Sequence, residues 1–304
     1  MRSAIETTGL TKFYGSVTAV SDLNLQVDPG QIFGFLGPNG AGKSTTIRML
    51  LALQRPSSGR ATLLGLDSAA DGVEVHRRIG YLPGDLELFP RLTGRQHIAW
   101  FARSRGGVDD SYVRHLLERF LVVVDRPVRE LSKGNRQKIG LVLAFMHRPE
   151  LLILDEPSSG LDPLMQHEFE NLLRETAAEG RTVFLSSHEL DEVQRTADRI
   201  GIIRAGKLVA VDTVEGLRRA APQKMEVRFR HPVSPAALEA LAGVRVTQSA
   251  GRRMMLDVVG EIGPVLKVIA SHDPVDLTAR PADLDELFLD FYRTSPETEA
   301  SHAG

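Results

Sequence analysis

The stretch GPNGAGKST at Gly37–Thr45 decides the fold class, because it matches the pattern G-x-x-x-x-G-K-[ST]. It follows a short apolar run at Gln31–Gly37, which predicts a strand, and it precedes a helical pattern. Glycines let backbone N–H groups converge on phosphate oxygens, and a helix that begins near Gly42 directs its positive end at the same anion. We therefore expect Lys43 to contact the β- and γ-phosphates of a nucleotide and the Ser44 hydroxyl to bind Mg²⁺.

Carboxylates follow a second apolar run, LLIL at 151–154. A buried strand there places Asp155 at the sheet edge where open α/β sheets bind ligands. We expect Asp155 to hold Mg²⁺ through its coordinated water and Glu156 to polarise the attacking water. Two carboxylates in such a turn are common by themselves, but a phosphate loop on a neighbouring strand favours the functional interpretation.

Three further features belong to the same hypothesis. His188 follows a third apolar run at Thr182–Leu185 and is placed to meet the γ-phosphate, although a lone loop histidine is often solvated surface. Tyr14 could stack on adenine, with ordinary packing as the alternative. The segment LSKGN at Leu131–Asn135 opens a helix capped by Ser132 and offers a second anion site. One phosphate loop binds one triphosphate, so this second site suggests a donor that acts in trans; the alternative is an ordinary helix cap.

Composition excludes several classes of protein. The 304 residues include no cysteine, which rules out disulfides, thiol nucleophiles and cysteine-based metal sites. The formal net charge of −2 gives no general basic field for nucleic acid, so no nucleic acid partner is expected. The chain has no apolar run near the roughly 18 residues that span a bilayer and no signal-peptide core. We expect a cytoplasmic chain whose membrane role comes through a partner.

The order of patterns predicts two domains. Residues 1–220 alternate short apolar runs with amphipathic stretches, which is typical of an α/β domain, and about 90–148 is mostly helical. Residues 221–293 follow the order β-α-β-β-α-β of a ferredoxin-like α+β accessory domain and end in a helix at Leu284–Tyr292. Residues 294–304 are polar and are expected to be a disordered tail.

Particular elements are also predicted. In the first domain, helices are expected from a Thr93 N-cap to Ser104, at Asp110–Leu121 and at Asn135–His147. In the second, strands are expected at Met225–Arg230, Val244–Gln248, Met254–Val259 and Val275–Thr278, with helices at Ala236–Leu241 and Val265–Ser271.

These motifs, in this order, resemble the nucleotide-binding subunit of an ABC transporter over residues 1 to about 220. The resemblance implies a P-loop NTPase fold of ABC type, with a mixed sheet and a helical subdomain. In family terms Gly37–Thr45 is the Walker A loop, Leu151–Glu156 the Walker B strand, and Leu131–Asn135 the signature. Ser159–Asp162 is the D-loop, and His188 is the switch histidine. The resemblance implies that Glu156, His188 and Lys43 are catalytic and that Ser44 and Asp155 bind the metal. The implied nucleotide-contacting residues are Tyr14, Gly37, Pro38, Asn39, Gly40, Ala41, Gly42, Lys43, Ser44, Thr45, Ser132, Gly134, Asn135 and Asp162.

The resemblance also implies partners. Two Mg-ATP are held in a head-to-tail dimer, either a homodimer or a pair with another ABC subunit, and hydrolysis drives a separate transmembrane permease at the inner face of the cell membrane. Tyr81-Leu82-Pro83, Phe89–Thr93 and Asp125–Pro127 fit the subgroup of drug and antibiotic exporters. The alternative is a non-transport ABC-type ATPase that acts on nucleic acid or ribosomes. Such relatives insert long coiled coils or carry two cassettes, and this chain shows neither.

One position departs from the family pattern. The family has glutamine, or sometimes glutamate, directly after Tyr81-Leu82-Pro83, whereas this chain has Gly84, followed by Asp85. The segment from Gly84 to about Trp100 is unusually apolar for a loop, and we expect it to dock the membrane partner; packing on the helical subdomain is the alternative. The C-terminal domain is expected to stabilise a dimer or to sense a ligand.

Overall fold

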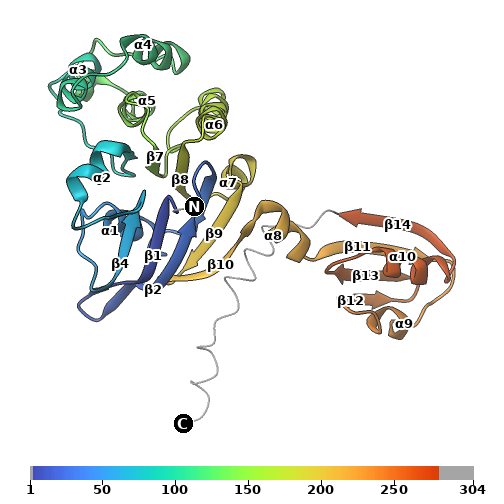
Figure 1. Cartoon of the computed structure of the whole chain (residues 1–304). Helices are drawn as coiled ribbons and strands as arrows, with labels where there is room; N and C mark the ends of the chain where they lie inside the picture. Colours follow the sequence, from blue (N-terminus) through green and yellow to red (C-terminus); the bar gives the residue numbers. More distant parts are fainter. Residues whose placement is uncertain (1–2, 281–304) are drawn as a thin grey trace. The chain divides into compact units, whose positions relative to one another are not determined.

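The computed structural model describes residues 3–280, which divide into two compact units (Figure 1). The first unit extends to Val211, and the second begins at Asp212. The sequence places the boundary nearer residue 220, because the texture changes only at Pro222. Helix α8 (Val214–Ala220) accounts for the difference, since its residues belong to the second unit.

Two sheets form the framework of the first unit. The four-stranded sheet has the order β2-β1-β4-β5, and the six-stranded sheet has the order β10-β9-β3-β8-β7-β6. The strands are β1 (Ile5–Tyr14), β2 (Val17–Val27), β3 (Ile32–Leu36), β4 (Ser58–Leu63), β5 (Leu66–Asp67), β6 (Ile79–Leu82), β7 (Leu151–Asp155), β8 (Thr182–Ser187), β9 (Arg199–Arg204) and β10 (Lys207–Thr213). Strands β6, β7, β8, β3 and β9 pair in parallel, whereas β1, β2, β4 and β5 are antiparallel, so the predicted mixed α/β fold is confirmed.

Seven helices and one 3-10 turn accompany these strands in the described part of the unit. They are α1 (Lys43–Leu50), α2 (Gly72–Arg78), α3 (Gly94–Ser104), α4 (Asp110–Arg119), η1 (Val128–Glu130), α5 (Lys133–Phe145), α6 (Pro163–Ala178) and α7 (Leu190–Thr196). Helices α3, α4 and α5 gather at one end of the unit, beyond the strands, in the region predicted to be helical (Figure 1).

The predicted helix starts follow from local capping. The Thr93 hydroxyl accepts from Gln96 N and the Gln96 side chain accepts from Thr93 N, which is a complete capping box. The Ser132 hydroxyl accepts from Asn135 N at 3.2 Å, so α5 begins at Lys133, two residues earlier than the sequence predicted. These two caps therefore fix the first residues of α3 and α5.

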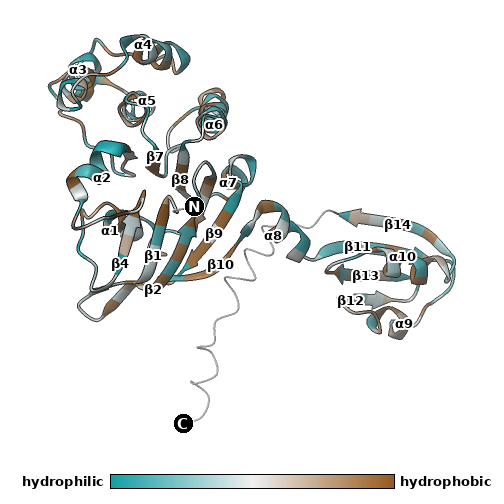
Figure 2. Cartoon of the chain, in the orientation of Figure 1, coloured by the Kyte–Doolittle hydropathy of each residue, from teal (hydrophilic) through white to brown (hydrophobic). Residues whose placement is uncertain are grey.

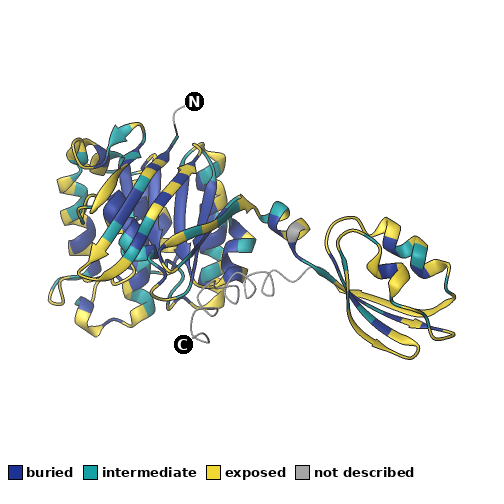
Figure 3. Ribbon diagram, turned by 90° about the horizontal axis from the view of Figure 1, so that it is seen from below, coloured by how far each residue is buried: buried dark blue, intermediate teal, exposed yellow. Residues whose placement is uncertain are grey.

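The core of the first unit lies around the central parallel strands. Every residue of β3, β7 and β8 is buried, as continuous apolar strands covered on both faces should be (Figure 3). The Phe33 and Phe184 rings stack with centroids 5.8 Å apart across the β3–β8 pair. A Cβ added at Gly34 would lie 2.1 Å from Val193 Cγ1, so only glycine lets α7 approach β3 this closely.

The second unit consists of an antiparallel sheet and short helices, of which α8 is the first. Its strands are β11 (Gln223–Phe229), β12 (Val244–Ala250), β13 (Arg253–Val258) and β14 (Pro274–Arg280), in the order β12-β13-β11-β14; its further helices are α9 (Ala236–Glu239) and α10 (Gly263–Ala270). Along the chain these elements follow the order β-α-β-β-α-β. Apolar residues of α9, α10 and the sheet form its core. Figure 2 colours the residues of the chain by their hydropathy.

The predicted helix at Leu284–Tyr292 and the predicted disordered tail at 294–304 lie outside the described residues. Within residues 3–280, no helix has both the length and the apolar character that a bilayer crossing requires.

Candidate active site

The loop between β3 and α1 forms a cradle of backbone amides. Gly40 and Gly42 have φ of 81° and 109°, a region that L side chains rarely adopt. At Gly42 an added Cβ would also lie 2.5 Å from Ala19 O, so both the backbone conformation and the lack of space require glycine there. Among the described residues, no side chain caps α1, and its first turn carries no acidic residue. The first N–H groups of α1 are thus available to an anion, and the helix dipole favours one there.

Lys43 lies folded against this loop. Its ammonium group is buried, and Nζ donates to Gly37 O at 2.6 Å and to Pro38 O at 3.2 Å. Nζ also lies 3.2 Å from Oε1 of Glu156. Carbonyl oxygens and a carboxylate thus surround the ammonium group in the loop, where a phosphate oxygen would be a stronger partner.

The ends of β7 and β8 bring the remaining charged groups together. Strand β8 pairs in parallel with β3, and β7 pairs in parallel with β8, so the carboxyl ends of all three strands meet at the edge that carries the phosphate loop. His188 Nδ1 donates to Glu156 Oε2 at 2.6 Å. Asp155 is buried, and its Oδ1 accepts from the Ser186 hydroxyl at 2.5 Å. The structure therefore joins Lys43, Glu156 and His188 in one hydrogen-bonded and ion-paired group, beside the oriented carboxylate of Asp155.

Glu156 has a strained backbone. Its φ is 50°, in the left-handed region, which costs an L residue about 1–2 kcal/mol. Its N–H donates to both Ser186 O and Ser186 Oγ, each at 3.2 Å. On the other side, Gln137 Nε2 donates to Pro157 O at 2.9 Å and lies 3.5 Å from Glu156 O. Surrounding hydrogen bonds therefore hold the carboxylate in place, as strained residues at functional sites require.

Known proteins of one family resemble this chain. A family model described as ABC transporter matches residues 20–159. The bacitracin transport ATP-binding protein BcrA of Bacillus licheniformis is 39% identical over 234 residues, which are 75% of this chain and 76% of that protein. The chain belongs to the ABC transporter family.

Other relatives of this ABC protein extend the match. The daunorubicin resistance ATP-binding protein DrrA3 of Streptomyces coeruleorubidus is 33% identical over 94% of this chain and 95% of its own length, so that relative aligns with nearly the whole chain. A solved structure of an ATP-binding subunit of an ABC transporter is 31% identical, with a TM-score of 0.66 over 71% of this chain and 92% of that one. The chain is thus an ABC-type ATPase that binds and hydrolyses ATP, and the cradle and charged group described above are its candidate site.

The signature segment of the ABC protein contacts the loop that follows β7. Lys133 Nζ lies 3.2 Å from the Ser159 hydroxyl, and a Cβ added at Gly134 would lie 2.6 Å from Gly160 O. Asn135 uses its amide twice, accepting from Val123 N and donating to Val123 O, each at 2.8 Å. The Asn135 side chain therefore fastens a neighbouring turn in this structure, and its nucleotide contact stays a prediction.

Two other predicted nucleotide contacts lie at element ends. Tyr14 ends β1 and is 45% exposed, and Lys12 Nζ lies 5.3 Å from the centroid of its ring. An exposed ring is accessible to stacking. Asp162 caps α6 by accepting from Met165 N at 3.0 Å. Its carboxylate thus has a structural use besides the predicted one.

The departure at Gly84 lies beside the metal-binding candidate. A Cβ added there would lie 3.2 Å from Oδ2 and 3.3 Å from Cγ of Asp155. Any side chain at position 84 would therefore start in tight contact with the carboxylate. Burial raises the pKa of the nearby Tyr81 phenol, and the negative charge of Asp155 raises it further. The family's glutamine position is thus adjacent to Asp155, although this chain places only backbone there.

Sequence reasoning missed two residues of the site, Gln137 and Ser186. The clue for Gln137 was a polar residue on the otherwise apolar inner face of α5, where it is 5% exposed. The clue for Ser186 was its position at the end of an apolar strand. Pairing it with Asp155 requires the β7–β8 register, which the sequence does not supply.

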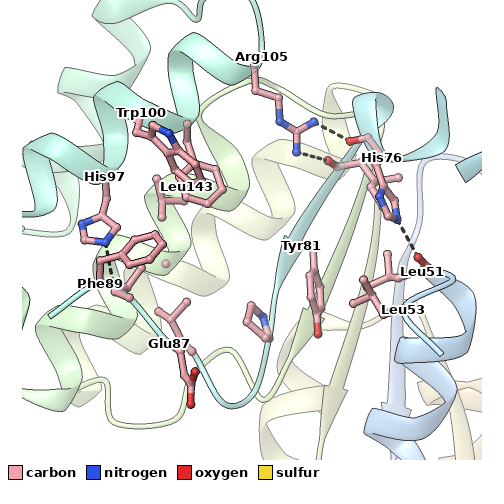
Figure 4. Close-up of a pocket in the computed structure, with 16 residues that line it drawn as sticks. Leu51, Leu53, His76, Tyr81, Glu87, Phe89, His97, Trp100, Arg105 and Leu143 are labelled. Carbon is pink, nitrogen blue, oxygen red and sulfur yellow. Dashed lines mark hydrogen bonds between the residues drawn. The ribbon is translucent and has the colours of Figure 1, made fainter. Parts of the chain in front are cut away.

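An apolar groove lies between α3, α5 and the strand β6 (Figure 4). It encloses about 360 Å³ and includes Tyr81, Phe89, Trp100 and Leu143. Phe89 is 58% exposed and Trp100 is 54% exposed, and their rings meet edge to face with centroids 6.1 Å apart. By contrast, Leu86 packs on α5, where a Cβ added at Gly140 would lie 2.5 Å from its Cδ2. The segment after Gly84 thus packs in part and leaves aromatic surface open.

Proposed function

We propose that this ABC ATPase powers a separate membrane permease that exports antibiotic-like compounds. The relatives support this: one is a bacitracin transport protein, and another that aligns over 95% of its length is a daunorubicin resistance protein. The proposal places the chain on the inner face of the cell membrane, held there by the permease.

The group formed by Lys43, Glu156 and His188 carries the proposal. Lys43 leaves its carbonyl partners for the β- and γ-phosphates, which frees the Glu156 carboxylate to accept a proton from the attacking water. His188, hydrogen-bonded to that carboxylate, orients it and faces the γ-phosphate. Backbone amides of the loop after β3 bind the phosphates.

The residues present fit a magnesium ion. Ser44 offers a hydroxyl at the start of α1, and Asp155 offers a buried carboxylate that Ser186 orients. Hard oxygen ligands of this kind suit Mg²⁺, which binds through few protein groups and keeps several waters. When bound, the ion neutralises charge on the β- and γ-phosphates.

Dimerisation explains the second amide-rich helix start. Lys133 and Gly134 contact the loop after β7, whereas Ser132 at the start of α5 is exposed. We assign Ser132 and Gly134 to the nucleotide of another subunit. In the proposed head-to-tail dimer each ATP lies between the phosphate loop of one subunit and the Ser132–Asn135 segment of its partner. Tyr14 stacks on the adenine.

The apolar groove is the proposed docking surface for the permease. Its exposed aromatic residues, Phe89 and Trp100, offer apolar area that a soluble monomer has no reason to expose together. Glu87 also lines the groove, so a basic side chain on the partner would be accommodated at its edge.

Purification from the native membrane tests the proposal. The tagged full-length chain should copurify with a multi-spanning membrane protein, and that protein should raise its ATPase rate. Recovery with ribosomes or nucleic acid, and with no membrane protein, would instead support the non-transport alternative.

A further inference from the structure

We propose that Gln137 is a positioning residue that holds the Glu156–Pro157 peptide, and thereby aims the Glu156 carboxylate at Lys43 and His188. The inference rests on the proposed role of Glu156 in hydrolysis. It adds a residue to the machinery of the reaction that itself contacts neither nucleotide phosphate nor water in the proposed mechanism.

The hydrogen bond made by Gln137 is buried and specific. The side chain lies in the second turn of α5, at 5% exposure, and its Nε2 donates to Pro157 O at 2.9 Å. Glu156 O lies 3.5 Å from the same nitrogen. A buried carbonyl that loses its donor keeps the full cost of its lost hydration, so this bond strongly favours the observed backbone.

The conformation of Glu156 needs such an anchor. At φ of 50° the residue relaxes toward negative φ unless its neighbours hold it. Ser186 holds the N–H side through two contacts of 3.2 Å, and Gln137 holds the carbonyl side. If the second anchor is lost, rotation at Glu156 swings the carboxylate away from Lys43 and His188.

The anchor also joins two functional segments of one chain. Gln137 lies one turn beyond Lys133, whose Nζ contacts the Ser159 hydroxyl, and Gly134 packs against Gly160 O. Three points along α5 thus touch the loop that begins with Glu156. In the proposed dimer, α5 serves the partner's nucleotide while Glu156 serves its own, so Gln137 lies on the route by which one site affects the other.

Steady-state ATPase measurements on the full-length chain test the inference. Gln137→Met removes the donor at similar volume, and Gln137→Glu keeps the shape while replacing the amide donor by an oxygen. The matched control is Gln31→Met, because Gln31 Nε2 is a buried amide group for which the described residues provide no hydrogen-bond partner. ATP binding and thermal melting are measured on every variant.

We expect kcat to fall at least about tenfold in both Gln137 variants, with KM for ATP changed less than about twofold, and Gln31→Met to stay within about twofold of wild type. In a Glu156→Gln background, Gln137→Met should lower the residual rate no further, because the two residues act as one unit. A merely structural role would instead lower the rate in both backgrounds.

The outcomes separate this inference from the proposed function. If Glu156→Gln is inactive while either folded Gln137 variant turns over at the wild-type rate, the inference alone fails. Near-wild-type turnover of Glu156→Gln would overturn the role of Glu156 and the inference with it. If Gln137→Met does not fold, the result with Gln137→Glu decides.

Discussion

Replacing Glu156 by glutamine removes one negative charge from the site and leaves its shape almost unchanged. The carboxylate lies 3.2 Å from Lys43 Nζ and 2.6 Å from His188 Nδ1, so it is the group that links both sides of the site. A positioned general base contributes about 10²–10⁴-fold to a rate, which is about 2.7–5.4 kcal/mol of transition-state stabilisation. We therefore expect kcat of the variant to fall by that factor, with KM for ATP nearly unchanged.

The same geometry predicts a small change in stability. At 3.2 Å and an effective dielectric constant of about 20, the attraction between Lys43 and Glu156 is about 5 kcal/mol, but desolvation of the two charges offsets most of it. Lys43 also retains its bonds to Gly37 O and Pro38 O, so no charge is left isolated. A net change of about 1 kcal/mol shifts the melting temperature by about 2–4 °C.

The assay combines ATP turnover, ATP binding and size-exclusion chromatography with ATP. Glu156→Gln should bind ATP, form ATP-dependent dimers and hydrolyse almost nothing. Glu189→Gln is the matched control, because Glu189 is exposed and lies 3.9 Å from His188 Nε2 without touching Lys43. Turnover of Glu156→Gln within about threefold of wild type would refute the assignment of Glu156 as the base.

Three further predictions address the dimer, the permease and the altered loop. Mixing Lys43→Ala and Ser132→Arg subunits should restore about a quarter of wild-type ATPase. Half of the dimers are then mixed, and each mixed dimer holds one intact site out of two. Activity no greater than that of the separate variants would count against action in trans. Phe89→Asp should abolish copurification with the permease and leave basal ATPase within about twofold of wild type. The control Val73→Asp, an exposed change outside the groove, should leave both copurification and basal ATPase unchanged. A Phe89→Asp chain that unfolds would favour packing over docking. Gly84→Gln should hydrolyse ATP faster than Gly84→Ala if the missing amide limits turnover, and equal rates would contradict that view.

Elements with local signals were predictable from the sequence. The α3 start follows from Thr93 and Gln96, whose side chains both lie within one turn of the helix start, and α5 follows from Ser132 in the same way. Strands β3 and β7 are continuous apolar runs bounded by Gly37 and by the Asp155–Glu156 pair. In each case the residues that determine the boundary are neighbours in the chain.

Contacts between distant segments were not predictable in this way. The bond from Ser186 to Asp155 depends on the β7–β8 register, and the bond from Gln137 to Pro157 depends on how α5 packs beside β6. Asn135 illustrates the same limit, because its position in the signature suggests a nucleotide contact while its amide bonds Val123 on both sides. A motif shows which residue types meet a ligand, whereas packing determines where each side chain points.

Gly84 shows how these two levels combine at one position. The sequence identifies a missing side chain, and in the structure a Cβ added at that position would lie 3.2 Å from Asp155 Oδ2. Since Asp155 is buried and fixed by Ser186 at 2.5 Å, an added Cβ at 3.2 Å requires the carboxylate or the loop to move by a few tenths of an ångström. With glycine at position 84, the Asp155 carboxylate accepts the Ser186 hydroxyl and no side chain of residue 84 lies against it. The effect of Gly84→Gln on ATP turnover is therefore the sum of a polar gain and a steric cost. Gly84→Ala adds the Cβ without the amide and measures the steric cost by itself.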